Sequence, residues 1–301
     1  MPVSNQLPGL FRLLRHIIGV LLAALITLGL TGCSAVKLSY QNAPELIYWW
    51  LDSYLDINDT QARPLRAELQ ALQAWHRQQE LPLYLGALEQ MQRMAPSAAS
   101  PAQVCSLIDG LRPRLQALLD RVEPGTSTLV PTLTAAQLAH LSRQFDKRSQ
   151  KWREQWLSGT PEERQASRLK RLIERAESFY GRLEDVQVSV LRASVSGSAF
   201  DANLSYRESQ RRYQDTLQTL RQLQGAGLTG TEVRTQVHAL LARSLRSPEA
   251  DYRNYLQGLD QENCETLAAL HNSTSAPQRR QLAETLKDYA SDVRALMNPQ
   301  R

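Results

Sequence analysis

The chain has 301 residues, of which 42% are hydrophobic and 22% charged, with 35 Lys and Arg against 30 Asp and Glu. This length allows one sizeable hydrophobic core or two small ones. A net charge of +5 is too small to indicate a nucleic-acid-binding protein, so nucleic acid is not an expected partner.

The N-terminal segment has the pattern of a cleaved export signal. Arg12 and Arg15 form a positive region, and an uncharged apolar run of 14 residues follows from 17 to 30. A membrane-spanning helix needs roughly 20 apolar residues, so this run favours a signal peptide over a permanent span. We therefore expect residues 1–32 to be removed. The remaining 269 residues carry a net charge of +3, because the removed part holds two arginines and no acidic residue.

The end of this segment, Leu30-Thr31-Gly32-Cys33, resembles a bacterial lipobox. The resemblance implies cleavage after Gly32, transfer of diacylglycerol to the Cys33 sulfur and acylation of the new amine. Each buried methylene contributes about 0.8 kcal/mol, so three acyl chains anchor far more firmly than one. By resemblance to bacterial sorting rules, Ser34 after the cysteine favours the periplasmic face of the outer membrane over the inner membrane. The alternative is a lone cysteine near an ordinary secretory cleavage site.

We expect residues 33–45 to form a lipidated tether and residues 46–298 a single helical domain. From 46 to 56, apolar residues recur at helical spacing around a wide face, which predicts a helix wedged into the bundle. The alternative is an interfacial helix whose Trp49 and Trp50 touch lipid. The acidic residues of this segment argue against that alternative, because interfacial helices usually carry basic polar faces.

Six helix starts along the chain are predicted by the same sequence pattern, the capping box. Ser, Thr or Asn before the helix is followed three residues later by Gln or Glu, so that each side chain can bond a free backbone amide of the other residue. Pro101 and Pro161 stand at first helical positions, where proline is favoured. The six pairs are Asn58 with Gln61, Ser100 with Gln103, Thr134 with Gln137, Thr160 with Glu163, Thr229 with Glu232 and Ser275 with Gln278.

Apolar residues at alternating steps of three and four predict amphipathic helices between these starts. The longest seam runs from Leu169 to Val190 and crosses Gly181, which we expect so long a helix to tolerate at about 1 kcal/mol. No alternating strand pattern competes. The sequence thus predicts an all-α protein, an elongated antiparallel helical bundle after a cleaved N-terminal signal peptide. Loops are expected at 95–100, 123–131, 194–203 and 225–230, and Pro64, Pro82 and Pro113 should start, kink or end helices.

No nucleophile with a base and no cluster of metal ligands stands out, so we expect no enzyme and no cofactor. His76 and Glu80 could share a metal, but a solvated or capping pair is the preferred interpretation. His271 lies seven residues after Cys264 and is interpreted as a helix-end residue. The acidic residues Asp52, Asp56 and Asp59 form either a cation site or solvated residues and a helix start.

A basic stretch lies in the middle of the chain. Between His140 and Arg182 there are eleven basic residues against six acidic ones. These could face anionic lipid or wall polymer, although a solvated face is the preferred interpretation.

Two cysteines, Cys105 and Cys264, remain besides the lipidated one. An even pair in an exported protein predicts a disulfide between them. Each lies in an amphipathic helical stretch, so both side chains can point inward. The alternative is two separately buried thiols that behave as small apolar residues.

After the lipobox, the chain carries a set of further segments that recur in one family: 36–43, 49–52, 75–77, 80–82 and 270–272, the last followed by Gln278 and Arg279. With these segments the chain resembles a family of proteobacterial lipoproteins that is catalogued only as a domain of unknown function. The resemblance implies no activity, substrate or site residues.

A second resemblance is local. The residues from Leu133 to Gln137 resemble the Leu-Thr-x-x-Gln motif of small periplasmic Spy-type chaperones, which are all-helical and work without nucleotide.

These observations favour a membrane-anchored, non-enzymatic lipoprotein that serves as a periplasmic structural or protein-interaction module. Its contact with the membrane would be the lipidated Cys33, and its partner would be an envelope protein. An ATP-independent periplasmic chaperone of the Leu-Thr-x-x-Gln type is the alternative.

Overall fold

The computed structural model describes residues 32–224 and 227–298, with the backbone alone for residues 32–35. The expected signal peptide up to Thr31 and the side chain of Cys33 therefore lie outside the described residues. The chain divides into two compact units after Asn42. Of the first unit, α2 (Gly32–Gln41) and Asn42 are described, and all later helices belong to the second.

The stretch expected to be a tether is helical. α2 covers most of residues 33–45, and α3 (Ala43–Leu55) begins directly after Asn42. At the end of α2, Asn42 Nδ2 donates a hydrogen bond to Leu38 O at 2.8 Å.

The second unit consists of helices joined by short loops, and its described residues contain no strand. The prediction of an all-α helical bundle is confirmed. All six predicted capping pairs occur at helix starts. The helices after α3 are α4 (Asp59–Trp75), the π-helical turn η1 (His76–Glu80), α5 (Leu81–Met94), α6 (Pro101–Leu129), the 3-10 turn η2 (Val130–Thr132), α7 (Ala135–Trp156), α8 (Pro161–Tyr180), α9 (Asp185–Gly197), α10 (Ala202–Leu223), α11 (Gly230–Leu245), α12 (Ala250–Asn272) and α13 (Ala276–Met297).

The seam across Gly181 is two helices, so the prediction of one long helix was wrong. Gly181 follows the last residue of α8 and has φ +72°, a conformation that glycine adopts without strain. The turn is held by Glu177, whose Oε1 accepts the Leu183 amide at 3.2 Å. A seventh capping pair, Glu184 with Gln187, then starts α9. The chain reverses here, and α9 packs against α8.

The loop expected at 123–131 is also wrong, because α6 continues to Leu129. The hydroxyls of Thr126 and Thr128 bond back to the carbonyl oxygens of Val122 and Pro124, at 2.9 and 3.1 Å. This part of α6 packs against α4 and α11, and tertiary packing overrides the weak helix propensity of the segment.

Proline acts differently at its three predicted positions. Pro64 and Pro113 lie inside α4 and α6, which continue through them. Pro82 follows the π-helical turn, in which the Leu81 amide bonds to His76 O, five residues back. Proline has no amide hydrogen and so cannot form the bond to the carbonyl four residues back that an α-helix requires. The wider π-helical turn before Pro82 is consistent with this loss.

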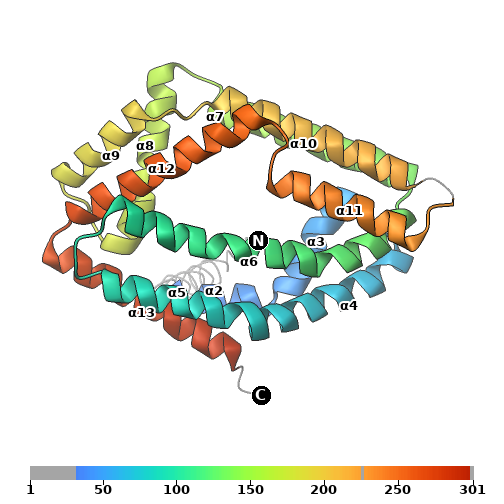
Figure 1. Cartoon of the computed structure of the whole chain (residues 1–301), viewed down its shortest axis with the longest axis horizontal. Coiled ribbons are helices and arrows are strands. Elements are labelled where there is room, and N and C mark those ends of the chain that lie inside the picture. The colour runs from blue at the N-terminus through green and yellow to red at the C-terminus, as the bar shows by residue number, and fades with distance from the viewer. Residues whose placement is uncertain (1–31, 225–226, 299–301) are drawn as a thin grey trace, which may run out of the picture. The chain divides into compact units, whose positions relative to one another are not determined.

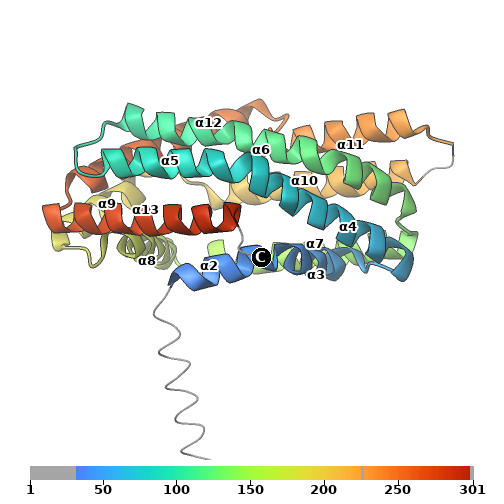
Figure 2. The same cartoon turned by 90° about the horizontal axis from the view of Figure 1, so that it is seen from below.

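The second unit has two lobes, which can be followed in Figure 1. In the first lobe, α3, α7, α10 and α11 form a core that includes Leu138, Leu223 and Val237, and α4 packs against α3. In the second, α8, α9 and α12 form a core that includes Leu191 and Leu270, and α13 packs against α8 and α5. The long α6 serves both lobes, since it contacts α12 as well as α11 and α4. Figure 2 shows α13 alongside α5, its main contact.

Each lobe contains a pair of buried glutamines that come from the third positions of two capping boxes. In the first lobe Gln137 Nε2 donates to Gln61 Oε1 at 2.7 Å, and Gln61 Nε2 donates back to Gln137 Oε1 at 3.3 Å. In the second lobe Gln187 and Gln278 donate to each other in the same way, at 2.9 Å both times. Each of the four also bonds a backbone carbonyl of its partner's helix start: Thr132 O, Asp56 O, Ser273 O and Arg182 O. We call these the glutamine pairs.

Candidate functional site

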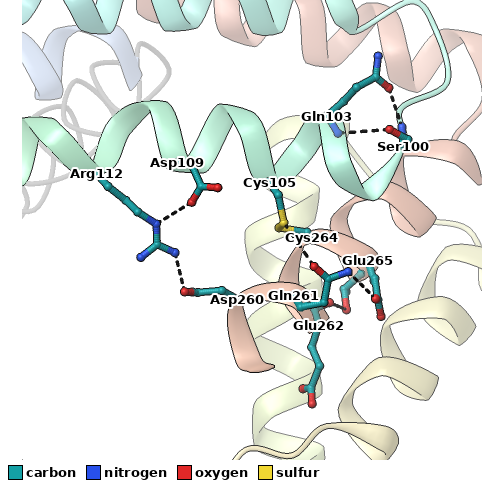
Figure 3. The surroundings of a disulfide bond; sticks show 11 residues. Ser100, Gln103, Cys105, Asp109, Arg112, Asp260, Gln261, Glu262, Cys264 and Glu265 are labelled. Carbon is teal, nitrogen blue, oxygen red and sulfur yellow. Dashed lines mark hydrogen bonds and ion pairs between the residues drawn. A yellow bond between two sulfur atoms is a disulfide. The ribbon is translucent and has the colours of Figure 1, made fainter. Parts of the chain in front are cut away.

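A disulfide joins Cys105 in α6 to Cys264 in α12, as the sequence predicts, with the two Cα atoms 5.4 Å apart. Figure 3 shows the bond beside a bridge in which Arg112 contacts Asp109 at 2.8 Å and Asp260 at 2.5 Å. Cys264 is 2% exposed. The disulfide therefore fastens the first half of α6 to the second lobe.

The end of α12 fastens the loop between α5 and α6. His271 Nε2 donates to Ser97 O at 2.8 Å, so its Nδ1 accepts the hydroxyl of Tyr180 at 3.0 Å. Asn272 bonds both backbone polar groups of Ala99, at 2.9 Å each. Burial lowers the pKa of His271, with a further contribution from the charge of Arg279. His271 is a helix-end residue, as predicted, and both its ring nitrogens are used in structural contacts.

His76 and Glu80 stand at the C-cap of α4 and the N-cap of α5, and the solvated part of the preferred interpretation was wrong, because Glu80 is buried. They lie in the π-helical turn, where Glu80 is 3% exposed and its Oε1 is 3.6 Å from an Arg114 nitrogen. Burial lowers the pKa of His76, and the charge of Glu80 opposes this shift. The His76 ring is 5.7 Å from that of Tyr84.

The three aspartates Asp52, Asp56 and Asp59 lie at or near the junction of α3 and α4. Asp52 Oδ1 accepts the Ile57 amide at 2.9 Å, Asp56 adopts φ +51°, and Asp59 begins α4. Nowhere in the described part of the chain do three His, Cys, Asp or Glu side chains gather as a metal ion would require. Likewise, none of the described helices combines the length and the hydropathy needed to cross a membrane.

The aromatic helix α3 is only partly covered by the bundle, contrary to the expected wedge. Trp49 and Trp50 are 60% and 55% exposed, and Leu46 shares their face at 45%. On the opposite side Tyr48 is buried and packs under Arg66, whose Cζ lies 3.6 Å from the ring centroid. We call Leu46, Trp49 and Trp50 the aromatic face.

Part of the basic stretch lines a cavity rather than a solvated face. The cavity has a volume of about 470 Å³ and lies between the two lobes, where α8 approaches the end of α7 and the start of α10. Arg164, Arg168 and Arg171 of α8 line one wall, and Trp156 and Phe200 line another. We call these five residues the arginine pocket.

Aromatic rings hold two of the three guanidinium groups in this pocket. Arg168 Cζ is 4.4 Å from the centroid of Phe200, and Arg171 Cζ is 4.3 Å from that of Trp156. The two rings lie 5.6 Å apart, and Trp152 stacks on Trp156 at 5.5 Å. Burial lowers the pKa of Arg168. Arginines at steps of four and three along α8, after a tryptophan-rich helix end, were the signal in the sequence for this pocket.

Comparison with known proteins gives a family and nothing more specific. A family of unknown function (DUF6279) matches residues 53–253, well over half of the 301 residues and including the whole arginine pocket. No curated protein and no solved structure matches the chain. The chain therefore belongs to DUF6279, a family to which no function has been assigned.

Proposed function

We propose that this protein is a non-enzymatic lipoprotein, held through acylated Cys33 at the periplasmic face of the bacterial outer membrane. There its helical lobes act as a structural or protein-interaction module for an envelope partner. The observation that carries the proposal is the exposed aromatic face of α3, a helix that begins ten residues after Cys33. Acyl chains at Cys33 would keep this face near the bilayer, and tryptophan favours the boundary between lipid and water.

Of the two aspartates that argue against contact with lipid, Asp52 accepts a backbone amide at the helix end, and Asp56 lies after the last residue of α3. Glu45, at the start of α3, pairs with Arg66. A basic residue lies beside the aromatic face instead. Arg148 donates to the Tyr54 hydroxyl at 3.4 Å, and the Tyr54 ring is 5.0 Å from that of Trp50. The polar surroundings of the face therefore suit a phospholipid surface.

A non-enzymatic role is supported by what the histidines of the second unit do. His271 connects α12 to a loop, and His140 Nε2 lies 3.0 Å from Ser53 O. His76 belongs to the π-helical turn, and His238 lies 3.8 Å from a Glu123 oxygen. The contacts of His271, His140 and His238 join residues that are far apart in the chain, as a structural role requires.

The anchor is tested by metabolic labelling with a palmitate analogue. The Cys33→Ala variant should lose the label and leave the outer-membrane fraction, while Cys105→Ala keeps both properties. Undiminished labelling of Cys33→Ala would refute the lipoprotein proposal.

Contact of the aromatic face with lipid is tested with the full lipidated protein in vesicles that contain brominated phospholipid, which quenches nearby tryptophan fluorescence. Quenching should be strong in the unmodified protein and largely lost in Trp49→Phe/Trp50→Phe. The matched control is Trp75→Phe, a half-buried position in α4 that should leave quenching unchanged. Equal quenching in all three proteins would show that the aromatic face does not meet the bilayer.

The alternative is an ATP-independent chaperone, and the residues of its Leu-Thr-x-x-Gln match also have local structural roles. Thr134 caps α7, Leu133 is in the core of the first lobe, and Gln137 belongs to a glutamine pair. Helix capping thus accounts for the motif without a client. Suppression of aggregation of a denaturing client at near-stoichiometric amounts, measured by light scattering, would favour the chaperone.

A further inference from the structure

We propose that the arginine pocket binds a ligand through a phosphate group. The pocket lies between the lobes and has a volume of about 470 Å³, within the range of small-molecule sites in proteins. Three guanidinium groups on one wall neutralise more than a single negative charge. That arrangement suits the multiple charge of a phosphate monoester or diphosphate better than it suits a lone carboxylate.

The guanidinium groups of the pocket are not neutralised by the protein. Among the described residues, no carboxylate lies within ion-pair distance of Arg168 or Arg171. Arg164 donates to a backbone oxygen, Gly159 O, at 2.6 Å. Two half-buried guanidinium groups without an ion-pair partner carry a desolvation cost, which a bound anion would offset.

The acidic side chains nearest to the pocket are occupied. Asp201, which lines it, accepts the amides of Asn203 and Leu204 at 2.7 and 3.0 Å and so caps α10. Glu262 acts on Arg168 electrostatically, but its oxygens accept from Ser198 Oγ at 2.9 Å and from the Ala199 amide at 3.0 Å. Neither carboxylate is placed to take the position of the ligand.

The aromatic rings prepare the arginines for an oxyanion. A guanidinium that stacks on a ring uses its face, which leaves the N–H groups at its edge to form two parallel bonds to phosphate oxygens. Phe200 and Trp156 hold Arg168 and Arg171 in this way, at 4.4 and 4.3 Å. The rings come from α7 and from the residues before α10, whereas the arginines come from α8 of the other lobe. A bound phosphate would therefore connect the lobes.

The test uses the full chain purified in detergent, with inorganic pyrophosphate as the soluble probe. The readout is the fluorescence of Trp156 and of Trp152, which stacks on it. Binding should weaken at least about tenfold in Arg168→Gln/Arg171→Gln, because the charge-assisted bonds of two guanidiniums are lost. Arg168→Lys/Arg171→Lys should fall between, since lysine keeps the charge but not the fork. The matched control is Arg175→Gln, an exposed arginine of the same helix outside the pocket, which should bind as the unmodified protein does.

A second arm separates two sources of phosphate. Phosphatidylcholine vesicles containing phosphatidic acid are compared with vesicles of phosphatidylcholine alone, with the same variants. Binding of pyrophosphate that depends on Arg168 and Arg171 supports a soluble ligand, and vesicle binding with that dependence supports a lipid headgroup. No binding in either arm, or binding that the glutamine variant does not weaken, would overturn the proposal.

A measurement on the unmodified protein guards against a variant that fails to fold. Phenylglyoxal modifies accessible arginines, and mass spectrometry locates the modified positions. Pyrophosphate, or the phosphatidic acid vesicles, should protect Arg168 and Arg171 but not Arg175. Equal modification with and without both probes would contradict the proposal independently of any substitution, and none of these results depends on Cys33.

Discussion

Replacement of Gln187 by alanine should be among the most destabilising single changes in the second lobe. Gln187 is 0% exposed and makes four hydrogen bonds. It donates to Ser273 O at 3.1 Å and to Gln278 Oε1 at 2.9 Å, and it accepts from Gln278 Nε2 at 2.9 Å and from the Glu184 amide at 2.7 Å. Glu184 and Gln278 belong to the starts of α9 and α13, and Ser273 is the C-cap of α12, two residues before the N-cap of α13.

The expected loss follows from what stays behind in Gln187→Ala. Ser273 O and the Glu184 amide lose their bonds to Gln187, while Gln278 Nε2 keeps its bond to Arg182 O at 2.9 Å. A buried polar group without a partner costs about 1 to 3 kcal/mol, so two such groups give about 2 to 6 kcal/mol, a large part of the roughly 5 to 15 kcal/mol by which domains are typically stable. Urea unfolding followed by circular dichroism measures this loss as a shift of the midpoint at constant slope.

The chain offers a matched control for this experiment. Gln103 occupies the same capping position at the start of α6 and accepts the Ser100 amide at 2.8 Å, but it is exposed. Gln103→Ala should therefore cost less than about 1 kcal/mol. In a double-mutant cycle, Gln187→Leu/Gln278→Leu should cost less than the sum of its single changes, because either single change already breaks both bonds between the two glutamines. Equal losses for Gln187→Ala and Gln103→Ala, or an additive cycle, would refute this account of the glutamine pair.

Two further predictions concern the second lobe. Cys105→Ser/Cys264→Ser should lower the free energy of unfolding by about 5 kcal/mol, which is the chain-entropy value for a loop of this length. If alkylation instead finds two reactive thiols in the denatured, unreduced protein, no disulfide forms. Stability should also fall as the pH is lowered below about 7. Burial lowers the pKa of His271 in the folded protein, whereas in the unfolded chain His271 has its ordinary pKa of 6.5. Acid therefore protonates His271 first in the unfolded chain and stabilises that state. His271→Gln should flatten this dependence in urea midpoints measured on either side of pH 6.5, and an unchanged slope would assign the effect to other groups.

Short-range features of this fold could be predicted from the sequence, because both partners lie within a few residues. The pair Ser100 and Gln103 is an example, since its geometry depends only on the local backbone. The break at Gly181 could not be predicted, because the apolar period resumes after the turn. The helix that starts after the turn is held in place by the bond of Gln187 to Gln278, which lies 91 residues further along.

The aromatic face and the arginine pocket could not be predicted from the sequence for a related reason. An apolar pattern shows that α3 has a wide apolar face, but not that neighbouring helices leave Trp49 and Trp50 uncovered. A run of arginines looks like a solvated face until Phe200, from before another helix, is found against Arg168. Both outcomes depend on which helices meet, and that is decided by contacts distant in the chain.

Because of the order of the helices along the chain, the first lobe can fold earlier during synthesis than the second. Every helix of the first lobe precedes residue 246, so that lobe can assemble before α12 and α13 are made. α5 appears early, yet its partner α13 comes last, and Glu89 meets Arg294 across a separation of 205 residues. Contacts of such long range are slow to form and leave apolar helix faces uncovered in the meantime. The nascent second lobe is therefore the part of this protein most in need of protection from aggregation, and a chain that ends before Ala276 would retain that need permanently.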